Sequence, residues 1–368
     1  MNTLKHLLRK LFNSQQSGLV IVILVIGLVL SLFAGAHVDH LTGRKINNFL
    51  NSYTLMQTGT DASFFAIMAI GMTLVIISGG IDLSVGSIYA LSGIAMAMFL
   101  RSAGALSPVA TVAIGISISL GVGLFCGLIN GVMITGLKVH PFIITLGTMW
   151  VFRGIAFVAS KAESILVPDA LTAVAKASFF GLAIYPVPML IMLAVMALGA
   201  IYLVKTVMGR HIYAIGGNAD ASRYAGLRVN RILVGIYVVS GLTAGIAAFV
   251  GSSYYGSASC ADATGYELYV IASAVVGGAS LSGGKGSALS AMLGAILIIL
   301  IRQSIRTLHL DQNYEWIIIG CAIIVAVVLD RLNARLTAKR LLTESVHARQ
   351  EDGGRTTDDG QRTTDGRV

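Results

Sequence analysis

The ionisable side chain with the clearest chemical potential is Asp82, in the Gly-rich segment Gly79–Gly86 between two strongly apolar runs. A carboxylate is costly in hydrocarbon and is tolerated where it faces water, a polar partner or the end of a broken helix. Asp82 also suits the N-cap of a helix that opens at Leu83 and Ser84, where it would satisfy unpaired backbone amides. Capping and contact with a passing solute are compatible, and both roles stay open.

A second Gly-rich segment resembles the first. Gly277–Gly284 and Gly79–Gly86 share the pattern Gly-Gly-x-x-Leu-Ser-x-Gly, with five identical positions in eight. Gly-interrupted helices at corresponding positions mark the path in many membrane transporters. The pair therefore predicts an internal repeat, although a chance match in a chain rich in Gly, Leu and Ser is the alternative. Whether the repeat is parallel or inverted stays open.

The segment Met208–Arg231 is the longest connection expected on the cytoplasmic side. Asn218 can cap a short helix that ends near Gly226. Ala221 and Ala225 lie one turn apart, so a second protein could approach the backbone closely. The segment also carries three basic residues that suit an acidic rim or lipid headgroups: Arg223, Arg228 and Arg231. A docking helix and a solvated basic loop are the two interpretations.

Two apparent ligand motifs fail on inspection. Gly284-Lys285-Gly286 lacks the remaining positions of a phosphate-binding loop, so we do not expect this chain to hydrolyse ATP itself. The residues His37, Asp39 and His40 lack further ligands, and we predict no metal site. Three cysteines without paired spacing give no disulfide framework.

The composition identifies the elements that must position these residues. The chain has 368 residues, 55% hydrophobic and 12% charged, against about 25% charged in a typical globular domain. An ordinary soluble enzyme is therefore excluded, and the 42 glycines favour closely packed helices over a β-barrel. Basic residues gather at the ends of apolar runs and in the tail, which argues against a nucleic-acid partner. We predict an all-α, polytopic transmembrane helical bundle with Gly-rich broken helices.

Ten apolar runs predict the spans, within a range of eight to eleven because the eighth is short. They are 18–36, 62–78, 83–100, 109–135, 141–159, 186–204, 232–252, 268–282, 287–303 and 315–330. An uncleaved first span is favoured over a signal peptide. Fourteen basic residues against eight near the membrane place both termini in the cytoplasm. The expected regions are a cytoplasmic amino end (1–17), a transmembrane domain (18–332) with the cytoplasmic segment 208–231, and a largely disordered cytoplasmic tail (333–368).

Asn130 lies on the small-residue stripe Gly123-x-x-x-Gly127-x-x-x-Gly131, which lets another helix approach closely. Helix packing is therefore its default role. Because the side chain is polar within a predicted span, we also include it among the candidates for the path.

Four motifs in order resemble the inner-membrane permeases of bacterial ABC sugar importers, in particular the ribose, xylose, arabinose and galactofuranose permeases. The resemblance covers about residues 55–332 and departs from the family in a longer stretch from His40 to Ala66 and in the polar tail. The motifs are Gly79 to Ser87, Arg210 to Val229 with Gly216-Gly217-Asn218 and Ala221-Ser222-Arg223, Thr264 to Leu268, and Gly277 to Gly286.

The resemblance implies a permease that pairs with a second copy or a similar permease, beneath an extracytoplasmic sugar-binding protein and above a cytoplasmic ATPase. A monosaccharide would pass between the permeases, with no catalytic residue, bound cofactor or metal in this chain and ATP used by the partner. The residues expected along the path and its broken helices are Gly79, Gly80, Asp82, Leu83, Ser84, Gly86, Asn130, Gly277 and Gly278. Those expected to couple to the ATPase are Gly217, Asn218, Ala221, Arg223, Ala225 and Gly226.

The alternative is an ion-coupled secondary transporter of a small polar solute. Such a protein would carry more intramembrane carboxylates, and beyond Asp82 the sequence offers chiefly Glu267 and Glu315, near span ends. A purely structural membrane subunit is disfavoured because two Gly-rich breaks would weaken its bundle. The sequence does not identify the sugar, because the resemblance places the specificity for it largely in the binding protein.

Overall fold

A computed structural model describes residues 15–38, 43–178, 185–322, 324–325 and 328. The described residues up to 322 belong to one compact unit. The expected amino end, 1–17, lies mostly outside the described residues, and the expected tail, 333–368, lies wholly outside them.

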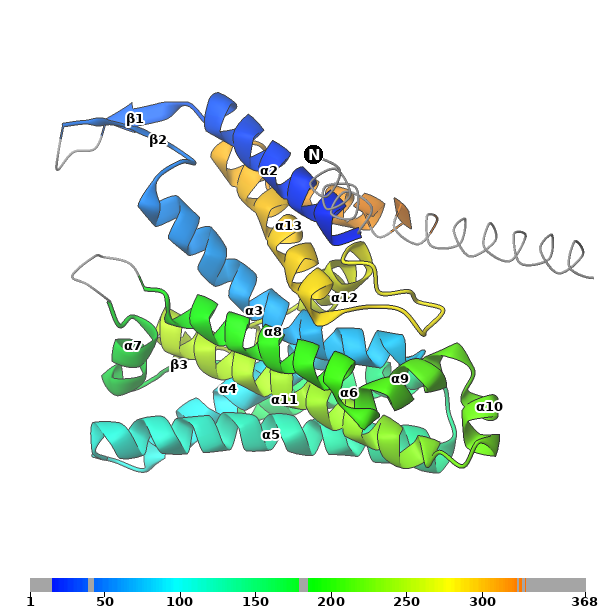
Figure 1. The fold of residues 1–368 in the computed structure, drawn as a ribbon. Helices are drawn as coiled ribbons and strands as arrows, with labels where there is room; N and C mark the ends of the chain where they lie inside the picture. Colours follow the sequence, from blue (N-terminus) through cyan, green and yellow to red (C-terminus); the bar gives the residue numbers. More distant parts are fainter. Residues whose placement is uncertain (1–14, 39–42, 179–184, 323, 326–327, 329–368) are drawn as a thin grey trace, which may run out of the picture. The chain divides into compact units, whose positions relative to one another are not determined.

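Within the described residues, eight helices are long and apolar enough to cross a membrane. They are α2 (Gln15–Phe33), α3 (Ser52–Ile77), α4 (Val85–Ser102), α5 (Pro108–Leu137), α6 (Pro141–Ser160), α8 (Val187–Lys205), α11 (Val229–Tyr255) and α13 (Ala288–Thr307). The predicted all-α bundle is confirmed (Figure 1).

One of the ten expected spans is contradicted, and another can be compared only in part. The run 268–282 forms α12 (Tyr266–Val276), whose 11 residues are well short of the roughly 20 needed to cross hydrocarbon. The helix ends there because Gly277 and Gly278 follow, and Gly278 has a left-handed φ of +97°. The tenth run is helical over 314–322, and most of its remainder lies outside the described residues.

The remaining elements are short. Three helices, α7 (Asp169–Ala175), α9 (Val207–Gly217) and α10 (Ala219–Tyr224), lie in the connections. Strand β1 (Ala36–Val38) pairs antiparallel with β2 (Lys45–Asn47), and β3 (Ile165–Leu166) pairs antiparallel with β4 (Ser257–Ala258).

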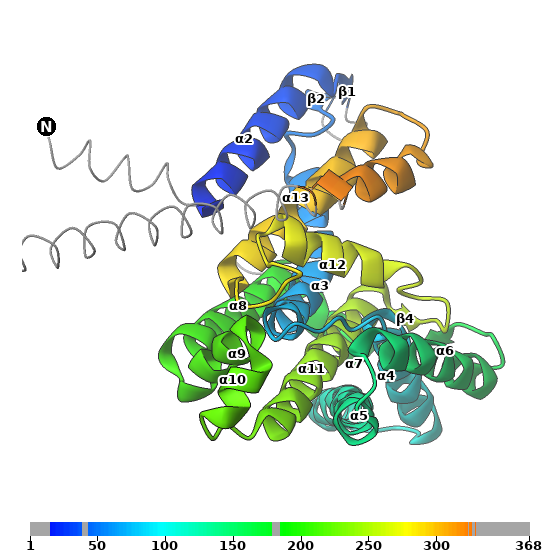
Figure 2. The ribbon, with the colours of Figure 1, turned by 90° about the vertical axis from the view of Figure 1, so that its right-hand side faces the viewer.

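Helix α3 forms the core of the bundle. It contacts α8, α11, α12 and α13 (Figure 2), and every residue of its most apolar window is buried. It begins ten residues before the expected run at 62, because Asn51 caps it by accepting a hydrogen bond from the backbone nitrogen of Thr54 at 2.8 Å. By contrast, α2 packs on α13 and leaves most of its side chains exposed, as expected of a helix that faces lipid.

The predicted glycine stripe brings α5 and α11 into backbone contact. A Cβ atom on Gly123 or Gly127 would lie 2.3 Å from a carbonyl oxygen of α11, and one on Gly131 would lie 2.7 Å from the Cα atom of Val234. Only glycine permits so close an approach, so the prediction of close packing at this stripe is confirmed.

Candidate functional site

The first Gly-rich turn is a break between two helices in the middle of the fold. Helix α3 ends at Ile77, α4 begins at Val85, and Gly79 has a left-handed φ of +85°. Burial alternates along the turn: the side chains of Asp82 and Ser84 are fully buried, whereas Leu83 is partly exposed. One side of the turn therefore faces the protein and the other faces away from it.

Both carboxylate oxygens of Asp82 are used within the protein. Oδ1 accepts hydrogen bonds from the backbone nitrogen of Ser84 at 3.0 Å and from its Oγ at 2.6 Å. Oδ2 accepts one from Oγ of Ser240, on α11, at 2.8 Å. The expected N-cap at Asp82 is wrong: the N-cap is Ser84, and Asp82 instead closes a turn onto the residue two positions ahead.

The hydrogen bonds continue from Ser84 into α5 and α6. Asn130 donates through Nδ2 to Ser84 Oγ at 2.7 Å, and Thr148 Oγ1 donates to Asn130 Oδ1 at 2.7 Å. Thr145 Oγ1 donates to the carbonyl oxygen of Ile81 at 3.2 Å. Asn130 thus does more than pack, because it ties the turn to two further helices. We call Asp82, Ser84, Asn130, Thr148 and Ser240 the buried polar network.

The second turn is longer than the first and lacks a carboxylate. It runs from the end of α12 at Val276 to the start of α13 at Ala288, with Ser287 as N-cap. Four of its glycines have positive φ: Gly278, Gly283, Gly284 and Gly286. The sequence pattern is therefore repeated together with one of its hydrogen bonds: Ser280, in the position of Asp82, accepts through Oγ from the backbone nitrogen of Ser282 at 3.3 Å, as Asp82 does from that of Ser84.

The two turns meet in space. The backbone nitrogen of Gly284 donates to the carbonyl oxygen of Ile77 at 2.8 Å. This carbonyl belongs to the last turn of α3, where intrahelical partners are lacking. The second turn therefore satisfies the end of the helix that leads into the first.

The expected coupling segment forms two short helices. Asn218 accepts a hydrogen bond from the backbone nitrogen of Ala221 at 2.9 Å, so the predicted cap is confirmed. Helix α10 ends at Tyr224, two residues before Gly226, which has a φ of +88°. Ala221 and Ala225 are exposed, so a partner protein has free access to this short helix.

Asp262 escaped the sequence analysis because Arg153, the charged group that lies near it, is distant in the chain. Arg153, on α6, donates to the carbonyl oxygens of Cys260, Asp262 and Ala263, at 2.9, 2.5 and 3.2 Å. Burial raises the pKa of the Asp262 carboxyl, while the backbone nitrogen of Ser259 and the nearby Arg153 act in the opposite direction.

Asp61 lies within α3 and was also missed, because the expected span began one residue later. It accepts from Gln57 and from the hydroxyl of Tyr255, at 2.9 and 2.8 Å, and lies 3.4 Å from Arg306. Glu315, which the sequence analysis did single out, lies 2.9 Å from Arg302. Each carboxylate therefore has partners within the protein.

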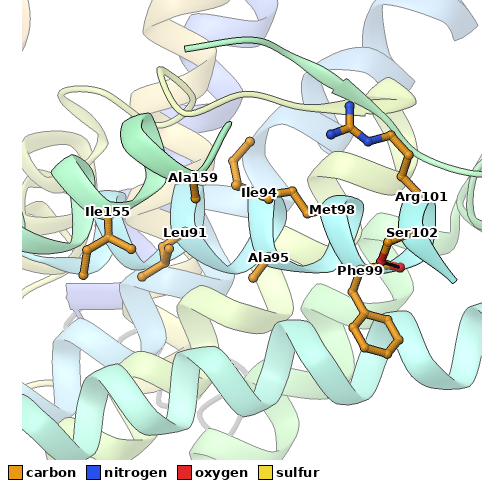
Figure 3. Close-up of a pocket in the computed structure, with 9 residues that line it drawn as sticks. All are labelled: Leu91, Ile94, Ala95, Met98, Phe99, Arg101, Ser102, Ile155 and Ala159. Atoms are coloured by element: carbon orange, nitrogen blue, oxygen red, sulfur yellow. Dashed lines mark hydrogen bonds between the residues drawn. The ribbon is translucent and has the colours of Figure 1, made fainter. Parts of the chain in front are cut away.

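An apolar cavity of about 610 Å³ lies between α4 and α6. Figure 3 shows Leu91, Met98 and Phe99 of α4 together with Ile155 and Ala159 of α6. Such a lining has few groups that can hydrogen-bond sugar hydroxyls, so we do not assign this cavity to the path.

Comparison with known proteins identifies the family. Residues 54–327 match the family model described as branched-chain amino acid transport system / permease component. The chain is 36% identical over 286 residues to the D-allose transport system permease protein of Escherichia coli K12, covering 77% of this chain and 85% of the relative. It is 36% identical over 291 residues to the ribose import permease protein of Haemophilus influenzae, covering 78% and 85%. It is 32% identical over 340 residues to the fructose import permease protein of Rhizobium meliloti, covering 91% of both. The chain therefore belongs to the permease family of ABC importers.

Proposed function

We propose that this chain is the permease subunit of a bacterial ABC importer and forms the path of a pentose or hexose across the inner membrane. The observation that carries the proposal is its identity of 32–36%, over most of its length, to permeases named for fructose, allose and ribose. ATP would be hydrolysed in a partner, and this chain would contribute no catalytic residue, cofactor or metal.

In this proposal the two sides of the first turn have different roles. Asp82 and Ser84 belong to the buried polar network and hold the turn in shape. Gly79 and Leu83 have exposed surface and line the path together with the partner permease. Asp82 therefore supports the path without touching the sugar, since both of its oxygens already accept hydrogen bonds from the protein.

The exposed α10 supports a docking role toward the ATPase. Its residues Ala221 and Ala225, with Gly217, Asn218, Arg223 and Gly226 beside them, would dock on the cytoplasmic ATPase. Both termini would then lie in the cytoplasm, and a sugar-binding protein would deliver the solute on the opposite side. ATP binding shifts the population between inward-open and outward-open forms by favouring one of them.

The first experiment is a mild-detergent pull-down of the tagged chain from its native membrane, with mass spectrometry of the accompanying proteins. An ATPase and a secreted binding protein are expected. A chain that comes down alone, with uptake that collapses on adding an uncoupler but not on ATP depletion, would replace the proposal by an ion-coupled secondary transporter.

The docking assignment has its own test. Ala221→Glu and Ala225→Glu should abolish sugar uptake in the reconstituted importer while the permease still folds, because a bulky charge blocks close approach of the ATPase. Ala105→Glu, at an exposed alanine outside this segment, is the matched control. Wild-type uptake in both α10 variants would contradict the assignment.

A further inference from the structure

The end of α9 meets both Gly-rich turns at one residue, Gly216. A Cβ atom on Gly216 would lie 1.7 Å from the carbonyl oxygen of Ile77 and 2.6 Å from the backbone nitrogen of Gly284. These two atoms form the hydrogen bond that joins the turns. Gly216 therefore lies directly against that bond, and no residue larger than glycine fits there.

Further contacts hold α9 to the second turn. A Cβ atom on Gly283 would lie 2.5 Å from the carbonyl oxygen of Gly216. Tyr213, about one helical turn earlier in α9, donates through its hydroxyl to the carbonyl oxygen of Gly286 at 2.7 Å. Helix α9 thus contacts the second turn on both sides of Lys285.

Helix α9 is also joined to α10 without a flexible linker. A single residue, Asn218, is the C-cap of α9 and the N-cap of α10. A displacement of α10 must therefore reach Gly216 through two residues of chain, Gly217 and Asn218.

We propose that Gly216 and Tyr213 are positioning residues that transmit the movement of α10 to both Gly-rich turns at once. The inference rests on the proposed function, in which the ATPase docks on α10. Neither residue contacts ATP or the sugar in this role, because each acts through the turns. Close-packed backbone passes a displacement on instead of absorbing it, so a bare glycine contact couples the three segments more tightly than a flexible side chain would.

Gly216→Ala and Tyr213→Phe test the proposal in the assembled importer, with the full-length chain, its ATPase and its binding protein in liposomes. Alanine at 216 must move its neighbour from 1.7 Å to an ordinary contact of at least 3.4 Å. The measurements are the amount of bound ATPase, the rate of ATP hydrolysis and the number of sugar molecules imported per ATP. We expect bound ATPase and hydrolysis to persist while sugar per ATP falls at least about fivefold in Gly216→Ala, within the usual range of coupling between sites. Tyr213→Phe, which loses one hydrogen bond, should show a smaller fall.

Matched controls come from positions without such contacts. Gly235→Ala adds a Cβ atom that meets nothing within 4 Å, and Tyr53 is 78% exposed, so Tyr53→Phe removes a hydroxyl from an exposed ring. Both controls should retain the wild-type ratio of sugar to ATP. This ratio separates transmission from a merely structural role, because partial misfolding lowers uptake and hydrolysis together.

The outcomes are distinct. Wild-type sugar-to-ATP ratios in both test variants would overturn the inference and leave the proposed function standing. Absence of any ATPase from the complex of the unaltered chain would instead contradict the proposed function. If Gly216→Ala does not accumulate in the membrane, Tyr213→Phe decides the matter, because it opens no cavity and introduces no clash.

Discussion

Replacing Asp82 by alanine and by asparagine separates the shape of this side chain from its charge. Its carboxylate accepts three hydrogen bonds, at 2.6, 2.8 and 3.0 Å, and is fully buried. Hydrogen bonds to a charged group contribute about 1.5–3 kcal/mol each, and bonds that share one side chain do not add fully. Asp82→Ala should therefore lower the free energy of unfolding by about 3–5 kcal/mol, less than the sum of three such bonds.

Asparagine keeps the oxygen that faces Ser84 and places an amide opposite Ser240, whose hydroxyl can rotate to accept from it. The cost of Asp82→Asn should then be about 1 kcal/mol. The assays are sugar uptake by cells and the unfolding midpoint of the purified protein in detergent. We expect Asp82→Asn to keep most of the uptake and Asp82→Ala to lose it. Asp311→Ala, in an exposed loop, should behave as wild type.

One result would refute this reasoning. If Asp82→Asn unfolds at the wild-type midpoint but transports no sugar, the negative charge itself acts on the solute or on a coupled ion. The supporting role assigned to the buried polar network would then be wrong, and the secondary-transporter alternative would gain ground.

Two further predictions concern the packing and the pH dependence of the fold. Gly127→Val should destabilise the protein by about 1–3 kcal/mol through overpacking, because a Cβ atom there would lie 2.3 Å from the carbonyl oxygen of Tyr237. Gly136→Val is the control, since a Cβ atom at Gly136 meets nothing within 4 Å. Equal unfolding midpoints for the two variants would contradict the prediction. Burial raises the pKa of the Asp262 carboxyl above its ordinary value of 3.8, so its contribution to stability is present below that value and is lost as pH rises through the folded pKa. Asp262→Asn should make the unfolding midpoint less dependent on pH over this window. If the slope of midpoint against pH is unchanged, Asp262 is not the origin of the pH dependence.

The sequence predicted features that depend on neighbouring residues and missed those that depend on distant ones. The apolar runs and the cap at Asn218 are local signals, and the structure has both. The partners of Asp82 and Asn130 include Ser240 and Thr148, which lie on other helices and carry no pattern of their own. A hydroxyl in an apolar helix looks the same whether it bonds its own backbone or a distant carboxylate.

The length of α12 shows a different limit. Glycine counts as nearly neutral in an apolar run, so hydropathy extended the span through Gly277 and Gly278 to 282. In the structure the helix ends at Val276, because Gly278 adopts a left-handed φ. Where glycine serves as a helix end, the same residue that permits tight membrane packing also hides the boundary from a hydropathy count.

The hydrogen bond between Ile77 and Gly284 would restrict how the proposed path opens. Ile77 is fully buried, and separating the two turns would leave its carbonyl oxygen and the amide of Gly284 without their mutual partner. An unsatisfied buried group costs about 1–3 kcal/mol, so separation is penalised at the carbonyl oxygen of the buried Ile77. Moving the turns together, with α9 held between them at Gly216, breaks no such bond. In the proposed importer, alternating access is therefore cheapest as a shared displacement of both turns relative to α5 and α11. The hydrogen bonds from Asn130 to Ser84 and from Ser240 to Asp82 would then need a second stable arrangement.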